Sequence, residues 1–159
     1  MFARIVHPRQ RAIALVAALL CAVILAGSAG APAVGEERFG RRKQMLALTN
    51  ADRERHDRAD LRFAARLSQY AKQHSEAMAR RGYIFHSSED ELRRVLDGYQ
   101  WSLGGENVGV GGSLERLQDA FMASQLHRKN ILRRLFDHAA VGVFRDDDDH
   151  LWVTVIFYG

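Results

Sequence analysis

The chain has 159 residues, of which 47% are hydrophobic and 26% charged, which suits one domain with its own hydrophobic core. Its net charge of +4 is unevenly distributed, because three basic residues precede the first apolar run and no acidic residue lies before Glu36. Beyond residue 29 the chain carries 20 basic and 19 acidic residues. This balance excludes general nucleic-acid binding, which requires a surplus of positive charge.

The N-terminal region has the layout of a Sec signal peptide, predicted over residues 1–29. Basic residues are followed by an apolar run over 12–26 and then by small residues. A membrane anchor is the alternative, but a spanning helix needs ~20 apolar residues and this run is shorter. We therefore expect a secreted protein with no stable membrane span after cleavage. The single cysteine, Cys21, lies in the apolar run, so the mature chain would have neither disulfide nor thiolate.

Residues 30–42 are predicted to be a linker, followed by a domain over 43–159. A first helix is expected over 41–55 and a polar loop over 56–61. A longer helix is predicted over 62–81, where apolar spacings of three and four form one stripe. The stripe consists of Leu67, Tyr70, Ala71, His74, Ala77 and Met78. Gly82 would end this helix, and His74, on the stripe, is expected to be a core residue.

Ser88 is expected to cap a short helix running to about Leu96, with Glu91 completing a capping box. The glycine-dense stretch 104–112 predicts a loop or a short irregular strand. Ser113 would cap the next helix, and a further short helix is expected over 127–132. Residues 139–144 and 151–157 are apolar and rich in β-branched residues, so they predict a terminal hairpin.

Helices come first, the hairpin comes last, and no βαβ alternation occurs. This order predicts an α+β fold with helices packed on an antiparallel sheet.

Four segments in fixed order resemble the bacterial branch of the CAP superfamily, whose SCP-like extracellular domains include cysteine-rich secretory, antigen 5 and pathogenesis-related proteins. The segments are LALTNADR (46–53), LSQYAKQHSEAMARRGYIFH (67–86), GEN (105–107) and HRKNIL (127–132), the last followed by Val141-Gly142-Val143 and the final strand. The likeness covers residues 46–157. No single segment is specific, and the order and spacing of all four carry the resemblance.

The resemblance implies an α-β-α sandwich with a central antiparallel sheet. It also implies a surface cleft where, in some members, histidine and acidic residues bind a divalent metal such as zinc. Carried over to this chain, the cleft residues are His86, Glu106 and His127, and Ser124 fits a bacterial W-x-x-S pattern. Phe121 replaces the tryptophan of that pattern, Gln125-Leu126 replaces Pro-Gly, and the second acid of the eukaryotic pattern is absent.

Imidazole nitrogens and a carboxylate oxygen are suitable zinc ligands. His86, Glu106 and His127 are 20 and 21 positions apart, so only the family fold would bring them together. The alternative is a hydrogen-bonded polar cluster that fixes the loops around the sheet. Asn107 and Asn130 are expected to serve a structural role by hydrogen bonding to the backbone.

The leading functional hypothesis is a secreted, non-enzymatic binding or interaction domain. Its partner would be a small apolar ligand or a component of the cell envelope. The alternative is a metal-dependent, peptidase-like hydrolase of the envelope, with His86, Glu106 and His127 as metal ligands. A structural envelope protein with a vestigial cleft is the third hypothesis. The sequence contains neither H-E-x-x-H nor G-x-S-x-G, which favours a protein that is not an enzyme.

Overall fold

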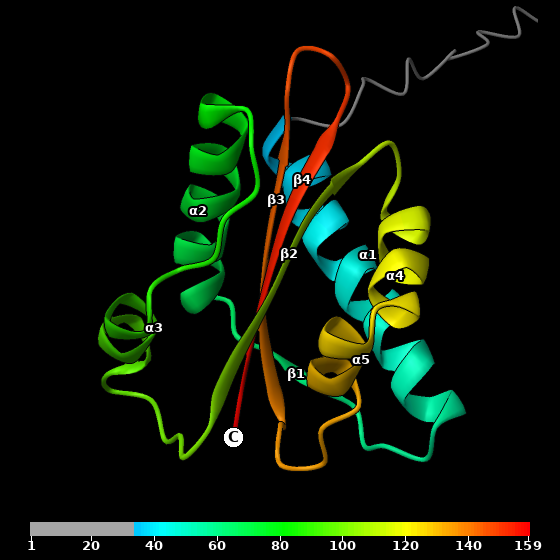
Figure 1. Cartoon of the computed structure of the whole chain (residues 1–159), viewed down its shortest axis with the longest axis vertical. Coiled ribbons are helices and arrows are strands. Elements are labelled where there is room, and N and C mark those ends of the chain that lie inside the picture. The colour runs from blue at the N-terminus through cyan, green and yellow to red at the C-terminus, as the bar shows by residue number, and fades with distance from the viewer. Residues whose placement is uncertain (1–33) are drawn as a thin grey trace, which may run out of the picture. The chain divides into compact units, whose positions relative to one another are not determined.

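The computed structural model describes residues 34–159, with side chains described from Gly40 onward. Helices and strands alternate irregularly along the chain (Figure 1). They are α1 (Val34–Arg55), β1 (Arg62–Phe63), α2 (Leu67–Arg81), α3 (Glu89–Leu96), β2 (Gly104–Gly111), α4 (Leu114–Ala123), α5 (Gln125–Ile131), β3 (His138–Arg145) and β4 (Leu151–Tyr158). The predicted signal peptide and Cys21 lie outside the described residues. Within the described part, no helix combines the length and apolar character needed to cross a membrane.

Strand β4 organises the sheet, whose strand order is β1-β3-β4-β2. All eight residues of β4 are buried, and β4 pairs antiparallel with β3 on one side and β2 on the other. The predicted terminal hairpin is therefore confirmed. β1 adds a two-residue parallel pairing to β3, so the sheet is mixed rather than purely antiparallel.

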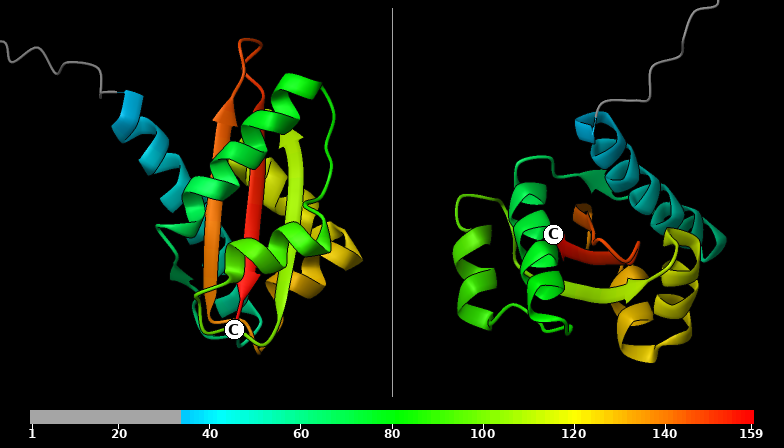
Figure 2. Two further views of the ribbon diagram at one scale, coloured as in Figure 1. Left: turned by 90° about the vertical axis from the view of Figure 1, so that its left-hand side faces the viewer. Right: turned by 90° about the horizontal axis from the view of Figure 1, so that it is seen from above.

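Helices cover both faces of this sheet, which confirms the α+β class and the three-layer architecture. Figure 2 shows α2 and α3 on one face and α1, α4 and α5 on the other. Alternate residues of a strand point to opposite faces, so each strand supplies both cores. Thus Ala140 and Ile156 pack in the cluster with Leu67, while Val141 and Val155 pack in the cluster with Phe121.

The helix predicted over 62–81 is wrong in its first five residues. The backbone N–H of Arg62 donates to Asp137 and that of Ala64 donates to Ala139, so this stretch pairs with β3. Helix α2 begins only at Leu67. Pairing with a distant strand has overridden the local helical pattern. The end of the helix is as predicted, because Gly82 takes the left-handed conformation, with φ of 74°.

Two further expectations differ from the structure. The linker predicted over 30–42 is helical from Val34 onward. The glycine-dense stretch is a regular eight-residue strand, β2, because every residue in it pairs with β4. Both predicted caps are confirmed. Ser88 and Glu91 form a capping box at α3, and the Ser113 hydroxyl accepts the N–H of Arg116 at α4.

Candidate functional site

Glu106 lies on β2, one of the two edge strands of the described sheet. The alternation of the strand turns Glu106 toward the layer of α2 and α3, and it turns Asn107 toward the layer of α4 and α5. The Glu106 side chain is 2% exposed. A carboxylate buried this deeply needs hydrogen-bond donors to offset its lost hydration.

Three donors surround the Glu106 carboxylate. Oε1 accepts the backbone N–H of Ser87 at 2.9 Å and lies 2.9 Å from His86 Nδ1. Oε2 accepts the Ser87 hydroxyl at 2.7 Å. The Ser87 hydroxyl in turn accepts a hydrogen bond from the phenol O–H of Tyr70 at 3.0 Å, which connects this network to α2. Both carboxylate oxygens are therefore hydrogen-bonded to neighbouring groups of the chain.

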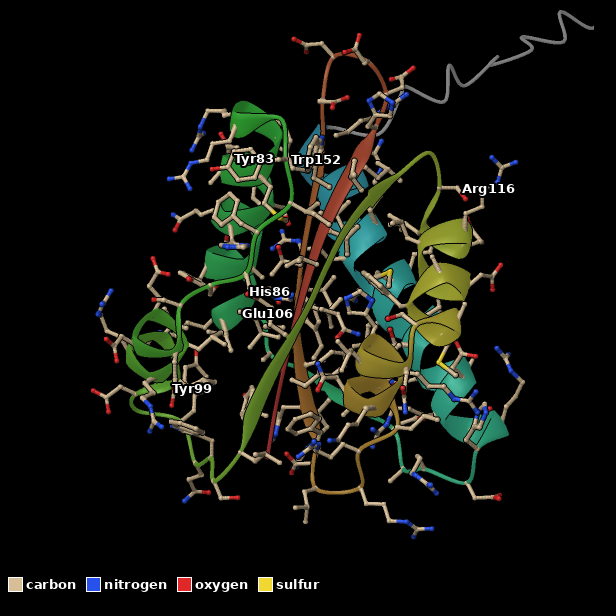
Figure 3. The ribbon with its side chains drawn as sticks, viewed as in Figure 1. Tyr83, His86, Tyr99, Glu106, Arg116 and Trp152 are labelled. Carbon is tan, nitrogen blue, oxygen red and sulfur yellow. The ribbon has the colours of Figure 1, made fainter. Side chains whose placement is uncertain are left out.

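His86 lies next to this carboxylate (Figure 3). Its side chain is 57% exposed, although its partner is buried. Since a carboxylate only accepts, Nδ1 carries the proton of the shared hydrogen bond and Nε2 of neutral His86 keeps a lone pair. Such a carboxylate fixes the tautomer and the ring orientation of a histidine.

His127 approaches from the other side of β2, on helix α5. Its carbonyl accepts Asn107 Nδ2 at 3.1 Å, and its ring packs edge-on against Phe121, with the centroids 4.9 Å apart. Burial lowers the pKa of His127, and the charge of His86 lowers it further. His127 is thus fixed to β2 through its backbone carbonyl, while its ring lies against Phe121 of α4.

Asn107 and Asn130 link α5 to β2. Asn130 Nδ2 donates to the Glu106 carbonyl at 3.2 Å and to Asn107 Oδ1 at 2.9 Å. Together with the bond from Asn107 to the His127 carbonyl, these contacts fix α5 beside the strand. Ser124 lies at the junction of α4 and α5, where its hydroxyl makes no capping hydrogen bond to α5.

His74 lies beneath the site and is buried, as expected for its stripe on α2. Its Nδ1 is 3.3 Å from Thr154 Oγ1, and its ring packs edge-on against Phe85. Its Nε2 is buried without a hydrogen-bond partner in the described structure. Burial lowers the pKa of His74, and the nearby Glu106 acts in the opposite direction.

Metal binding was the most specific expectation for this site. Within the described residues, no group of three or more His, Cys, Asp or Glu side chains is arranged to hold a metal ion. The oxygens of Glu106 face His86 and Ser87 instead. Zinc binding by His86, Glu106 and His127 stays a prediction, and no chemical step is derived from it.

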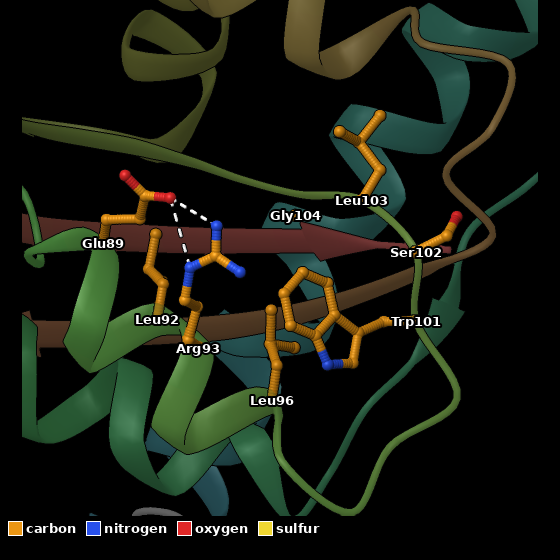
Figure 4. A pocket seen from close by; sticks show the side chains of 8 residues that line it. All are labelled: Glu89, Leu92, Arg93, Leu96, Trp101, Ser102, Leu103 and Gly104. Atoms are coloured by element: carbon orange, nitrogen blue, oxygen red, sulfur yellow. Dashed lines mark hydrogen bonds and ion pairs between the residues drawn. The ribbon is translucent and has the colours of Figure 1, made fainter.

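A cavity of about 380 Å³ lies further along the same face of β2 (Figure 4). It opens beside Gly104, two residues before Glu106, and its lining includes none of the three predicted cleft residues. The lining combines apolar side chains with one ion pair: Leu92, Leu96, Trp101 and Leu103, with Ser102, Gly104 and the pair Glu89–Arg93. This cavity was not predicted from the sequence, although the amphipathic stretch 89–96 was an available signal for it.

Ser87 is another functional residue that was not predicted from the sequence. It supplies two of the three donors to Glu106. Its burial between the exposed residues His86 and Ser88 is a period-of-two pattern, typical of an extended segment against a sheet.

The three-layer fold, with Glu106 on an edge strand paired to His86 in the segment after α2, is the arrangement of an SCP-like domain. The model of the CAP cysteine-rich secretory protein family matches residues 46–157, and the chain belongs to this family. It is 33% identical over 107 residues to the protein YkwD of Bacillus subtilis (strain 168), covering 63% of this chain and 41% of YkwD.

Solved structures show the same fold. An extracellular protein containing an SCP domain from Bacillus anthracis str. Ames is 29% identical with a TM-score of 0.64, over 76% of this chain and 41% of that one. An outer surface protein from Borrelia burgdorferi is 18% identical with a TM-score of 0.65, over 75% of this chain and 92% of that one. This chain thus spans about two fifths of YkwD and of the Bacillus anthracis protein.

Proposed function

We propose that the chain is a secreted binding domain that recognises a small apolar ligand without chemically transforming it. The main observation behind the proposal is that both oxygens of the Glu106 carboxylate are hydrogen-bonded, to His86 and to Ser87. A general base must reach the proton it abstracts, and both oxygens of this buried carboxylate are already engaged. Glu106 therefore acts as a structural anchor of the cleft.

The surroundings of the two histidines also favour binding over catalysis. Among the described residues, no serine or threonine hydroxyl hydrogen-bonds to the ring of His86 or of His127. The nearest hydroxyl in sequence, that of Ser87, donates to Glu106. A nucleophile and its base are expected within hydrogen-bond reach of each other.

The cavity beside Gly104 supports the ligand class. Its volume falls within the ~300–1,000 Å³ of ordinary small-molecule sites, and such sites combine an apolar lining with a few polar groups. Here the apolar part is formed by Leu92, Leu96 and Trp101, and the Arg93 guanidinium stands at the margin, bonded to Glu89. Secretion is supported by the Bacillus anthracis relative, which is an extracellular protein.

The proposal is tested with anilinonaphthalene sulfonate, an apolar aromatic anion whose fluorescence rises on burial. We expect saturable binding to the full chain and a raised Tm at excess probe. Leu92→Glu, which places a charge in the cavity, should weaken binding at least tenfold, whereas Leu135→Glu, at an exposed site outside the lining, should not. Equal binding of the probe by both variants would show that the cavity is not the ligand site.

A metal-dependent hydrolase is the second candidate. It is favoured by the exposed His86 ring, whose hydrogen bond between Nδ1 and Glu106 resembles the carboxylate contact that commonly orients a metal-binding histidine. This candidate predicts cleavage of a denatured protein such as casein, lost with chelator and with His86→Ala or His127→Ala. Cleavage that persists in both variants would exclude these residues as its source.

A further inference from the structure

The cavity beside Gly104 is formed mainly by one segment of the chain, residues 88–101, which we call the flap. Five of the eight lining residues belong to the flap, and the other three follow directly after it: Glu89, Leu92, Arg93, Leu96 and Trp101, then Ser102, Leu103 and Gly104. Leu96 and Trp101 lie next to each other in the close view of the cavity (Figure 4). The size and the opening of the cavity therefore depend on where the flap lies.

Hydrogen bonds anchor the chain immediately before and immediately after the flap. Before it, the backbone N–H and the hydroxyl of Ser87 donate to the Glu106 carboxylate at 2.9 and 2.7 Å. After it, the backbone N–H groups of Ser102 and Leu103 donate to the Gly159 carbonyl at 2.8 and 3.0 Å, and the Leu103 carbonyl accepts the N–H of Gly159 at 3.2 Å. Because Glu106 lies on β2 and Gly159 directly follows β4, both ends of the flap are fixed to the sheet.

Between these two anchors, the flap forms hydrogen bonds and ion pairs only within itself, as far as the described chain extends. Ser88 and Glu91 form the capping box of α3, and Arg93 pairs with Glu89 one turn away. Movement of the flap away from the sheet therefore breaks no hydrogen bond between the flap and the rest of the described chain. Segments held in this way open locally at a lower free energy than the core.

Apolar contacts hold the flap on the sheet. Leu96, which is 1% exposed, is the only buried residue of the flap. It packs in one cluster with residues of β3 and β4, and Leu92, Val95, Tyr99 and Trp101 pack against that cluster while partly buried. Helix α3 lies at the outside of its layer, beside α2 (Figure 2). Since apolar contacts are non-directional and depend on the area removed from water, the flap can lose and regain them as one surface.

We propose that the flap lifts off the sheet as one unit, with its two hydrogen-bonded ends as hinges, and that this movement opens the cavity. A ligand in the cavity adds apolar contacts to the inner face of the closed flap, so it shifts the flap toward the closed state. The role of the flap in ligand entry rests on the proposed binding function, whereas the opening itself is a property of the free chain. Different measurements therefore test the two.

Amide hydrogen exchange of the free, full-length chain tests the opening. A segment that opens as a unit exposes surface, so the exchange of the amides of 92–96 should accelerate together when urea is added below the unfolding transition. These amides should exchange at least about tenfold faster than those of β4, the buried central strand. Exchange of 92–96 that does not depend on urea, which indicates fraying of single turns, would overturn the proposal. Exchange as slow as that of β4 would also overturn it.

Two leucine-to-alanine variants separate opening of the flap from unfolding of the whole domain. Leu96→Ala removes apolar contact between the flap and the sheet, so it should accelerate the exchange of 92–96 at least about tenfold. Leu117→Ala is the matched control, because Leu117 of α4 is also buried but packs in the cluster on the other face of the sheet. It should accelerate the exchange of β4 and leave that of 92–96 unchanged. Equal acceleration of 92–96 by both variants would overturn the proposal, since the flap would then open only with the whole domain.

Saturating anilinonaphthalene sulfonate tests the link between the flap and the cavity. We expect the bound probe to slow the exchange of 92–96 at least as much as that of β4, because an open flap does not hold the probe. Slower exchange in β4 with unchanged exchange in 92–96 would show that the probe binds while the flap is open, and would overturn the role of the flap in ligand entry. Absence of probe binding would instead contradict the proposed binding function, and the exchange of the free chain would still decide whether the flap opens.

Discussion

Gly142 of β3 lies directly against the backbone of Ala71 in α2. A methyl group at Gly142 would lie 2.1 Å from the carbonyl carbon and oxygen of Ala71 and 2.4 Å from the nitrogen of Lys72. Real side chains do not approach so closely, and a backbone cannot rotate away as a side chain can. The absence of a side chain at Gly142 therefore sets how closely α2 packs on the sheet.

Gly142→Ala should consequently destabilise the domain by about 3 kcal/mol or more, because α2 must move and leave its packed position. Gly112→Ala is the matched control, since no neighbouring atom lies within 4 Å of the added methyl. Urea unfolding followed by circular dichroism measures both. Similar midpoints for the two variants would show that α2 is not held by this contact.

Glu106→Ala should lower the free energy of unfolding by about 1–3 kcal/mol, because the backbone N–H of the buried Ser87 loses its acceptor. The exposed Glu115, which accepts from Gln44 at the surface, is the control, and Glu115→Ala should change stability by less than about 0.5 kcal/mol. Equal losses in urea unfolding would contradict the anchoring role of Glu106.

Acid should destabilise the domain through His74 and His127, whose pKa values are lowered by burial. Below the ordinary histidine pKa of about 6.5 the unfolded chain binds protons that the native chain does not. Stability is therefore complete above that pH and falls as the pH drops toward the lower native values. The slope is at most about 1.4 kcal/mol per pH unit for each histidine.

His74→Gln should flatten this dependence between pH 7 and pH 5, because the variant has no imidazole to protonate there. Unfolding free energies at five pH values suffice for the comparison. An identical slope in the wild-type chain and His74→Gln would assign the acid sensitivity to other groups.

Zinc is the remaining expectation for the cleft. Titration calorimetry of the chelator-treated chain should give one-site binding that the His86→Ala/His127→Ala variant lacks. Glu106→Gln should weaken binding about 10–100-fold, as is usual for a group that orients a metal ligand. If the wild-type chain gives no heat of binding, or if the double variant gives the same heat, the prediction of a zinc site at His86 and His127 is wrong.

Much of the fold was predictable because local signals and tertiary packing agree there. The apolar stripe of α2 is such a case, and so are the Ser88 capping box and the β-branched hairpin. The prediction was wrong for the first residues of the long helix, because Arg62 and Phe63 form a strand by pairing with β3, which their local sequence does not indicate. Strand β2 has four glycines in eight residues, so its regularity comes from β4 and not from its own propensities.

The site was less accessible from the sequence than the fold. His86 and Glu106 are 20 positions apart, and only the family resemblance suggested that they meet. The roles of the two residues could not be read from spacing, because they depend on Ser87, whose contribution comes from a backbone N–H as well as a hydroxyl. Similarly, the cavity depends on where the loop before β2 places Trp101 relative to α3.

The position of β4 has a consequence for how the domain assembles. This strand is the last of the described elements along the chain, yet it joins β2 to β3 and forms the middle of the sheet. A polypeptide that emerges from its N-terminus exposes both partner strands before the strand that unites them exists. Closure of the sheet must wait until residues 151–158 are available, and a ribosome stalled before Leu151 would hold an open, aggregation-prone chain.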